Sequence, residues 1–277
     1  MAKVAILYIA TGRYIVFWEH FYRSAEKFLL PKSDKHYFVF TDSPHILGED
    51  HSNVTRIEQK KLGWPYDTLM RFDIFLSIRE TLENFDYIYF FNGNSEILVE
   101  VNESEFLPLE DNYNLVFTHQ PHMFHLSKRR FTYDRNPESC AYIPQGGGKY
   151  YFTGALNGGK AKYYLEMCEK LSQNTHTDLE KNIIARWHDE SHLNRYAIGR
   201  MDIKILPPYF TRSESEKWKT SAKIMFSDKT HYRFGGHAYL RGESENKITP
   251  TEWEEKYKNK KRRFSFRIKQ YIKSWFL

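Results

Sequence analysis

The stretch Tyr87-Ile88-Tyr89-Phe90-Phe91-Asn92-Gly93-Asn94 decides how this chain folds. Its first five residues form an uncharged, largely aromatic run, which is typical of a buried parallel strand in an α/β protein. A polar turn centred on glycine follows at the carboxyl end of the strand, where open α/β sheets bind their ligands. The two asparagine amides can hydrogen-bond a sugar or a phosphate ester, but they carry no charge with which to hold a divalent cation.

The residues before this strand predict a Rossmann-like half with a parallel sheet, because strands and helices follow each other along the chain. The expected strands are residues 4–10, 36–42 and 53–59, and the expected helices are residues 16–30 and 68–82. No Gly-x-Gly-x-x-Gly motif follows the first strand, so the dinucleotide-binding fingerprint is absent.

The second half is expected to contain strands at residues 113–118 and 150–153, separated by a polar and aromatic excursion. Residues 160–198 have the pattern of two helices. Gly146-Gly147-Gly148 predicts a turn or hinge, since no Lys-Ser/Thr follows to complete a phosphate-binding loop. Gly158-Gly159 is expected to end another short element.

Composition indicates one large α/β domain with an appendage, since the chain has 277 residues and 41% hydrophobic content. No apolar run approaches the ~20 residues that span a bilayer. The apolar N-terminal stretch lacks a convincing cleavage site, so we expect a first strand rather than a signal peptide. Two cysteines, Cys140 and Cys168, are too few for a disulfide framework, which favours a reducing, cytoplasmic location.

The net charge of +6 comes entirely from the C-terminal segment. Residues 256–277 contain nine lysines and arginines and no acid, which leaves 32 basic against 35 acidic residues elsewhere. A mildly acidic body argues against a nucleic-acid-binding core. Phe264, Ile268, Tyr271, Ile272 and Trp275 recur at helical spacing, so this basic amphipathic tail is expected to lie on an anionic membrane surface, peripherally on the inner face of the cell membrane. The alternative is a helix that packs its aromatic face on the domain.

The run Trp187-His188-Asp189-Glu190-Ser191-His192-Leu193-Asn194 concentrates the side chains that can do chemistry. His188 and His192 at i and i+4 share a helix face and could bind a transition metal. A solvated, charged helix end is a second interpretation. The favoured one is a sugar site, in which the Trp187 ring packs on a pyranose and the carboxylates bind hydroxyls or an anomeric centre.

Several blocks, in this order, resemble glycosyltransferase family 6, which includes the histo-blood-group A and B transferases and the α1,3-galactosyltransferase. The resemblance runs from about Val4 to about Arg233, and its most specific block is the eight-residue run that begins at Trp187. The other matching blocks are residues 8–14, 24–27, 37–42, 131–137 and 141–144.

The resemblance implies an α/β chain with a GT-A fold, a Rossmann-like mixed sheet flanked by helices. Residues 1–245 would be the glycosyltransferase domain, with a nucleotide-sugar half at about 1–100 and an acceptor half with a closing segment at 101–245. Residues 246–277 would be the tail. The implied reaction is a retaining transfer of Gal or GalNAc from its UDP sugar to the 3-position of a galactoside, through either a covalent intermediate or a front-face attack.

The family pattern also assigns roles to individual residues. Glu190 matches the glutamate beside the anomeric carbon, and it would act as a nucleophile or as an electrostatic stabiliser. The donor-binding positions are Ala10, Thr11, Tyr14, Arg71, Asn92, Asn94, Gly154, Ala155, Asp189, Lys229 and Arg241. The acceptor-binding positions are His119, Gln120, Thr132, Thr153, Trp187 and Glu190.

Asn92-Gly93-Asn94 departs from the vertebrate pattern, in which an Asp-x-Asp pair binds Mn²⁺, and it resembles the bacterial, metal-independent members. Amides in place of both acids remove two anionic oxygen ligands, so we expect no metal cofactor. Charge on the diphosphate would be met by side chains such as Arg71, Lys229 and Arg241.

We therefore expect a metal-independent α1,3-N-acetylgalactosaminyltransferase that acts on a 2-fucosylated β-galactoside. The small residues Thr153-Gly154-Ala155 favour UDP-GalNAc because they leave room for the acetamido group. The alternatives are a UDP-Gal-using α1,3-galactosyltransferase and a non-catalytic carbohydrate-binding protein. The expected partners are the UDP sugar, the galactoside and an anionic membrane, with no nucleic acid.

Overall fold

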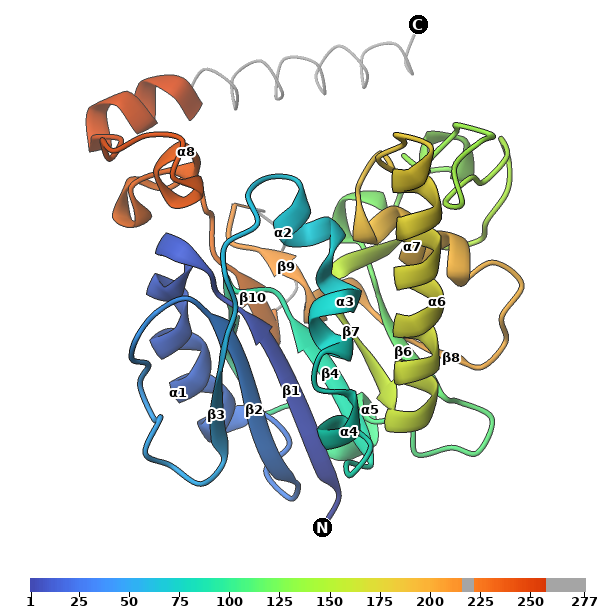
Figure 1. Ribbon diagram of the computed structural model, residues 1–277, viewed down its shortest axis with the longest axis horizontal. Coiled ribbons are helices and arrows are strands. Elements are labelled where there is room, and N and C mark those ends of the chain that lie inside the picture. The colour runs from blue at the N-terminus through green and yellow to red at the C-terminus, as the bar shows by residue number, and fades with distance from the viewer. Residues whose placement is uncertain (216–221, 258–277) are drawn as a thin grey trace, which may run out of the picture. The chain divides into compact units, whose positions relative to one another are not determined.

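Seven strands form the central sheet, in the order β3-β2-β1-β4-β7-β6-β8 (Figure 1). The computed structural model describes residues 1–215 and 222–257. Strands β1 to β4 run parallel, β7 runs antiparallel to both of its neighbours, and β8 is parallel to β6. The mixed sheet expected of a GT-A fold is confirmed. Its strands are β1 Lys3–Ile9, β2 Asp34–Thr41, β3 Val54–Glu58, β4 Tyr87–Phe91, β6 Leu115–His119, β7 Phe152–Lys160 and β8 Ile203–Leu206.

Helices cover both faces of this sheet (Figure 1). A second sheet of three strands has the order β5-β10-β9, with β5 Ser95–Ile97, β9 Arg212–Ser213 and β10 Ile224–Phe226. The α-helices are α1 Trp18–Phe28, α2 Tyr66–Leu69, α3 Arg71–Leu76, α4 Arg79–Leu82, α5 Glu103–Phe106, α6 Ala161–Glu180, α7 Asp189–Tyr196 and α8 His237–Arg241. Short 3-10 helices are η1 Gly12–Phe17, η2 Pro121–Met123, η3 Lys128–Arg130, η4 Pro208–Phe210 and η5 Tyr232–Phe234.

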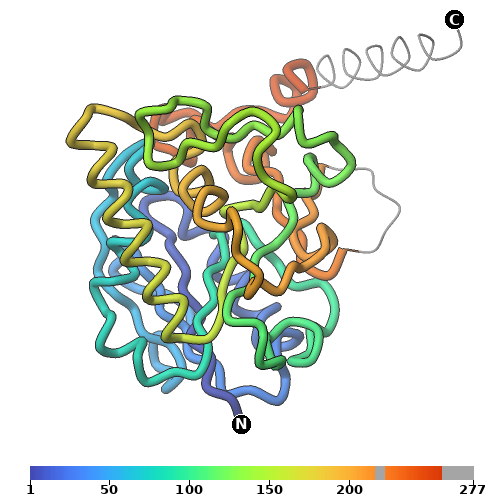
Figure 2. The backbone as a smooth tube through the Cα atoms, turned by 90° about the vertical axis from the view of Figure 1, so that its right-hand side faces the viewer, coloured from blue at the N-terminus to red at the C-terminus, as the bar shows by residue number. Residues whose placement is uncertain are grey.

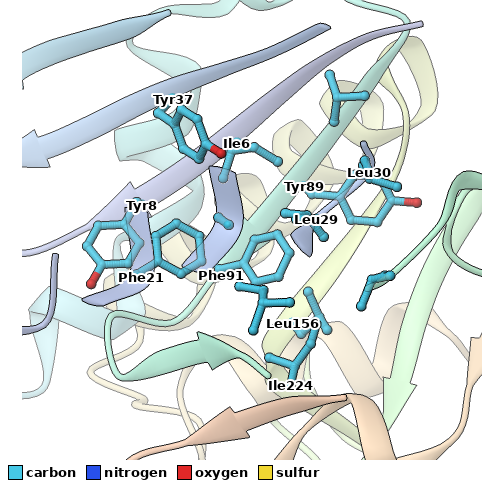
Figure 3. Close-up of a cluster of buried hydrophobic side chains, with 14 of the residues drawn as sticks. Ile6, Tyr8, Phe21, Leu29, Leu30, Tyr37, Tyr89, Phe91, Leu156 and Ile224 are labelled. Carbon is cyan, nitrogen blue, oxygen red and sulfur yellow. The ribbon is translucent and has the colours of Figure 1, made fainter. Parts of the chain in front are cut away.

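Aromatic packing fixes α1 against its face of the sheet, as Figure 3 shows for the buried cluster. The ring of Tyr8 from β1 stacks on Phe21 of α1 at a centroid distance of 4.7 Å, and Phe21 lies 5.3 Å from Phe91 of β4. Such aromatic pairs contribute beyond the area that they bury. The carboxyl ends of β1 and β4 are therefore held in a fixed register.

The opposite face packs against α3 and α6. Phe72 and Phe75 of α3 are buried there together with Tyr164 and Leu171 of α6. α6 has the pattern of a helix that turns one side to the core, since its buried residues recur mostly at spacings of three and four. This packing places Arg71, the first residue of α3, beside Phe90 near the carboxyl end of β4.

The structure corrects one expected helix and shortens another. The helix predicted at residues 68–82 is three short ones, α2, α3 and α4, because the backbone leaves helical geometry at Met70 and at Ile78. The helix predicted at 16–30 is confirmed as α1, but it is preceded by η1 and ends at Phe28.

The strand predicted at residues 150–153 is longer than expected. β7 continues through Gly158-Gly159, which were expected to end a separate element. A Cβ at Gly158 would lie 2.3 Å from the Tyr89 ring of the neighbouring β4, so this glycine permits close packing inside the strand rather than ending it. The strand at 87–91 is parallel to β1, as expected, but antiparallel to β7.

An irregular segment connects β6 to β7, drawn in green in Figure 2. Its own small core contains Phe131, Tyr133, Ile143 and Tyr151, with the Tyr133 and Tyr151 rings stacked at 5.2 Å. Since Phe131 and Tyr133 are buried in this cluster, Thr132 between them is held in place.

The chain divides into two units, Met1–Ser227 and Asp228–Leu277. The second unit contains η5 and α8, and the Trp253 ring lies 4.5 Å from His231. The domain boundary predicted after residue 245 stays a prediction. Within the described ranges, no helix is long and apolar enough to cross a membrane. The amphipathic face predicted for the tail lies outside the described residues.

Candidate active site

The carboxyl ends of β1 and β4 lie side by side because the two strands are paired and parallel. Ala10 and Thr11, which follow β1, are buried. The Thr41 hydroxyl donates to the Ala10 carbonyl at 2.7 Å, and the Ala10 N–H donates to the Phe40 carbonyl at 2.9 Å. Tyr14 lies half-buried in η1, directly after this segment. The predicted uridine-contacting residues therefore lie together at the carboxyl end of β1.

The Asn92-Gly93-Asn94 turn is fixed by its own hydrogen bonds. The Asn92 amide donates to the Asn94 side-chain oxygen at 3.0 Å, and the Asn94 amide donates to the Ser227 carbonyl at 2.7 Å. The Tyr8 hydroxyl donates to the Gly93 carbonyl at 2.5 Å. Asn94 is buried and Asn92 half-buried, and a neutral amide pair that already bonds to itself does not fit the anionic oxygen set that a hard divalent cation requires.

β7 brings the donor side and the carboxylates together. The Asn92 N–H donates to the Ala155 carbonyl at 2.8 Å. Gly154 precedes Ala155 in β7, and its N–H donates to Glu190 Oε2 at 2.9 Å. Asn92 and Glu190 therefore contact consecutive residues of one strand. A Cβ at Gly154 would lie 2.7 Å from Asp189 Oδ2, so only glycine fits between the strand and α7.

Glu190 is half-buried, and both of its carboxylate oxygens accept hydrogen bonds. The Tyr151 hydroxyl donates to Oε1 at 2.9 Å, and Thr132 donates to the same hydroxyl oxygen at 3.2 Å. Burial raises the pKa of Glu190 from its ordinary 4.5 to about 7, although the bonds from Gly154 and Tyr151 oppose the rise. A carboxyl that titrates near neutrality and points to one end of the sheet is typical of a catalytic group.

Arg71 and Asp189 form a buried ion pair beside Glu190. The Arg71 guanidinium donates to Asp189 Oδ2 and, at 2.9 Å, to the Gly154 carbonyl, and it lies 4.1 Å from the centre of the Phe90 ring. Burial raises the pKa of Asp189, and the adjacent guanidinium opposes that rise. The pair spans 118 positions of sequence and joins α3 to the start of α7.

A sharp turn presents Asp189 and Glu190 to the site. His188 precedes α7 with a left-handed φ of 52°, which is uncommon outside glycine and often marks a functional segment. Its ring packs edge-on against Trp64 at 4.6 Å. Asn194, one turn further along, exchanges hydrogen bonds of 2.9 and 2.8 Å with the backbone of Phe152 and so fixes α7 to β7.

This geometry rejects two of the three interpretations of residues 187–194. Asp189, Ser191, His192 and Asn194 are buried, so the segment is not a solvated helix end. His188 lies before the helix, whereas His192 is buried in it, with Nε2 3.7 Å from Asp178 Oδ2. The two histidines therefore share no metal-binding face, and the described residues contain no cluster of three His, Cys, Asp or Glu side chains suited to a metal ion.

Among the residues predicted for the acceptor side, Trp187 accepts the Glu190 N–H through its carbonyl, and Thr132 and Gln120 are linked to Glu190 through Tyr151. Trp187 is 46% exposed, enough for its ring to pack on a sugar. Thr132 contacts Tyr151, and the Gln120 N–H donates to the Tyr151 carbonyl at 2.9 Å. His119 is buried, burial lowers the pKa of its ring, and its Nδ1 has no hydrogen-bond partner among the described residues. Thr153 is buried, and its Oγ1 accepts from the Ala155 N–H at 3.1 Å.

Sequence reasoning missed Tyr151 and Asn194 as site residues. Tyr151 lies in the short apolar run directly before Thr153, and Asn194 ends the specific run that begins at Trp187. The only sequence feature that could have indicated them is that each stands next to residues already predicted for the site. Lys229 and Arg241 belong to the second unit, and their role at the donor stays a prediction.

A hollow of about 670 Å³ lies elsewhere, lined by Ala2, Asp86, Tyr87, Lys160 and neighbouring residues. These residues mark the amino ends of β1 and β4. Ligands of open α/β sheets bind beyond the carboxyl ends of the strands, which is where the perturbed carboxylate lies. We therefore place the site at the carboxyl ends of the strands and not in this hollow.

Comparison with known proteins places the chain among glycosyltransferases. The model of glycosyltransferase family 6 matches residues 2–232. The O-antigen biosynthesis glycosyltransferase WbnI of Escherichia coli is 32% identical over 234 residues, which are 84% of this chain and 98% of that protein. The histo-blood group ABO system transferase 1 of Rattus norvegicus is 27% identical over 75% of this chain and 60% of its own length. The globoside alpha-1,3-N-acetylgalactosaminyltransferase 1 of Gallus gallus is 27% identical over 75% of this chain and 61% of its own length. This chain thus spans about three fifths of these two vertebrate relatives.

Proposed function

This chain belongs to glycosyltransferase family 6, and we propose that it transfers GalNAc from UDP-GalNAc to the 3-hydroxyl of a 2-fucosylated β-galactoside. The transfer would retain the anomeric configuration and need no divalent cation. Its membership of the family makes it a hexosyltransferase of the GalNAc/Gal type. The donor, the acceptor and the independence from metal are the proposal.

The observation that carries the proposal is the contact between Glu190 and the Thr153-Gly154-Ala155 segment. Gly154 has no side chain and Ala155 only a methyl group, and the Thr153 hydroxyl is turned to its own backbone. Asp189 and Glu190 already fill the position that a side chain at Gly154 would take, so room for an acetamido substituent on the donor sugar would come from the short side chain of the half-buried Ala155. The chicken relative, named for α-1,3-N-acetylgalactosaminyl transfer, supports the same donor.

Glu190 would act where positive charge develops on the sugar. The bond between the anomeric carbon and the diphosphate oxygen breaks, and its electron pair leaves with UDP. The acceptor 3-oxygen forms a new bond to the anomeric carbon. The proton of the acceptor hydroxyl is transferred to a diphosphate oxygen of UDP. The Glu190 carboxylate either forms a transient bond to the anomeric carbon or stabilises the cation while the acceptor attacks from the same face. Both routes need Glu190 ionised.

The diphosphate charge would be balanced by cationic side chains instead of a metal. Arg71 is already fixed beside Asp189 and Gly154, and Lys229 and Arg241 are the proposed further contributors.

The membrane contact proposed for residues 256–277 is a separate part of the proposal. A chain without these residues that binds anionic vesicles as well as the full chain would contradict that part.

Turnover should be unchanged by EDTA, since the Asn92-Gly93-Asn94 turn lacks the anionic ligands that hold Mn²⁺. The measurement is UDP release from UDP-GalNAc and from UDP-Gal, with a fucosylated galactoside, in EDTA and in Mn²⁺. We expect UDP-GalNAc to be the better donor under both conditions. A strict need for Mn²⁺, or a preference for UDP-Gal, would overturn the corresponding part of the proposal. An absence of release under every metal condition would instead favour a carbohydrate-binding protein.

Tyr151→Phe should move the acidic limb of the kcat/KM profile to higher pH. The wild-type limb should titrate near pH 7, because the ionised form of Glu190 is the active one and its pKa is about 7. Loss of the Tyr151 hydroxyl removes a donor that stabilises the carboxylate, so the pKa rises and less of the enzyme is active at neutral pH.

Tyr133→Phe is the matched control, because it also removes a buried tyrosine hydroxyl, one that donates to the Tyr150 carbonyl and not to Glu190. The two variants are compared by kcat/KM against pH. An unchanged limb in Tyr151→Phe, or an equal shift in Tyr133→Phe, would show that Glu190 does not set the profile.

A further inference from the structure

Three consecutive cationic side chains, Lys128, Arg129 and Arg130, lie exposed on η3, and we call them the basic strip. None of the three forms an ion pair with another residue in the described ranges. Their backbone is nonetheless fixed. The Arg130 N–H donates to the Ser127 carbonyl at 2.9 Å, and the Phe131 N–H donates to the Lys128 carbonyl at 3.2 Å. A cluster of cationic side chains without ion pairs, on a backbone fixed by hydrogen bonds, can bind an anionic partner.

The local charge balance points the same way. Residues 119–149 contain five lysines and arginines against two acids. One of the acids, Asp134, is buried, and its carboxylate accepts the N–H groups of Asn136 at 2.8 Å and Arg186 at 2.7 Å. The exposed surface of this segment is therefore positive, although the body of the chain outside the tail is mildly acidic.

The basic strip is joined directly to the acceptor side of the site. The residue after it, Phe131, packs 5.8 Å from the Tyr151 ring, and Tyr151 donates to Glu190. Arg130 is two residues from Thr132, so their Cα atoms are no more than about 7 Å apart. A partner surface that binds the basic strip therefore lies close to the acceptor-binding end of the site.

An exposed aromatic ring belongs to the same segment. Phe124 is 45% exposed, and its ring packs edge-on against the buried His119 ring at 5.0 Å. Basic residues with a neighbouring exposed aromatic ring are characteristic of segments that rest on anionic lipid, because the charges meet headgroups while the ring enters the interface. A single phosphate would instead be held by converging donors in a pocket, whereas these three cations lie spread on the surface.

We propose that the basic strip and Phe124 rest on the phosphate headgroups of an anionic bilayer, so that the acceptor side of the site faces acceptors anchored in that membrane. This contact uses residues of the first unit and is distinct from the tail. The membrane contact does not depend on which UDP sugar is the donor, whereas the orientation of the acceptor side rests on the proposed function.

The test compares two full-length triple variants that lose the same charge. Lys128→Gln/Arg129→Gln/Arg130→Gln removes the basic strip, and Lys162→Gln/Lys170→Gln/Lys181→Gln removes three exposed lysines on and just after α6. Binding to vesicles of phosphatidylcholine mixed with phosphatidylglycerol is measured by flotation. Each basic residue near an anionic surface contributes about fivefold, so the strip variant should bind about 100-fold more weakly. The difference should shrink as salt is raised.

Two further arms separate the proposal from its alternatives. Turnover with a soluble galactoside should be the same in both variants, which shows that the site is folded, while KM for a lipid-anchored galactoside in anionic vesicles should rise only in the strip variant. Equal vesicle binding by the two variants would overturn the proposal. Loss of binding to soluble heparin with unchanged vesicle binding would also overturn it and would identify a polyanion site. A failure to transfer sugar at all would bear on the proposed function and not on this binding result.

Discussion

Glu190→Gln should lower kcat by about a thousandfold while leaving the affinity for UDP nearly unchanged. Glutamine keeps the shape of the side chain but removes the negative charge that either mechanism requires, and loss of one such electrostatic group typically costs two to three orders of magnitude. The amide also cannot accept from both Gly154 and Tyr151 as the carboxylate does. UDP should still bind, since the predicted uridine contacts lie at the end of β1.

The measurement is kcat with saturating donor and acceptor, together with a UDP dissociation constant from calorimetry. Glu138→Gln, an exposed glutamate in the same half of the chain, is the control and should behave as wild type. A Glu190→Gln enzyme with near-normal turnover would remove Glu190 from the mechanism. Loss of UDP binding along with turnover would mean that the substitution had disrupted the donor site.

Arg71→Met should be the most destabilising single change at the site, by about 3–5 kcal/mol, because it leaves the Asp189 carboxylate buried without its partner. The substitution also removes the donor to the Gly154 carbonyl and the cation over Phe90. The free energy of unfolding is measured by urea denaturation. The variant should also lose activity, since Arg71 lies beside the diphosphate in the proposed function.

The double variant Arg71→Met/Asp189→Leu separates charge burial from lost packing. It removes both charges, so it should be more stable than Arg71→Met alone. In the single variant burial raises the pKa of Asp189, so folding favours the protonated form. Its stability deficit should therefore shrink as pH falls through that raised pKa and grow as pH rises. If the single variant is as stable as the double one at neutral pH, burial of the unpaired Asp189 carboxylate is not what destabilises it.

Most of the strand framework was predictable, because hydrophobic runs and polar turns report on local burial. The parallel strands of the first half and the two helices of residues 160–198 are confirmed. The single helix expected at residues 68–82 was wrong, since apolar spacing does not reveal that the backbone breaks at Met70 and Ile78. The length of β7 was also missed, because two glycines that usually end a strand here permit close packing, Gly158 against the Tyr89 ring and Gly159 against the backbone of Asn114 and Leu115.

The sequence by itself determined the chemistry of the site residues. The run from Trp187 to Asn194 carries the family pattern, and Asn92-Gly93-Asn94 has amides where a metal-binding pair would have acids, both of which are properties of neighbouring residues in the chain. Only the tertiary structure decided which groups meet. Glu190 accepts from Tyr151 and Gly154, 39 and 36 positions away, and Arg71 pairs with Asp189 at a separation of 118. These contacts exist because β7 enters the sheet beside β4 and lies against α7, and no local pattern encodes that placement.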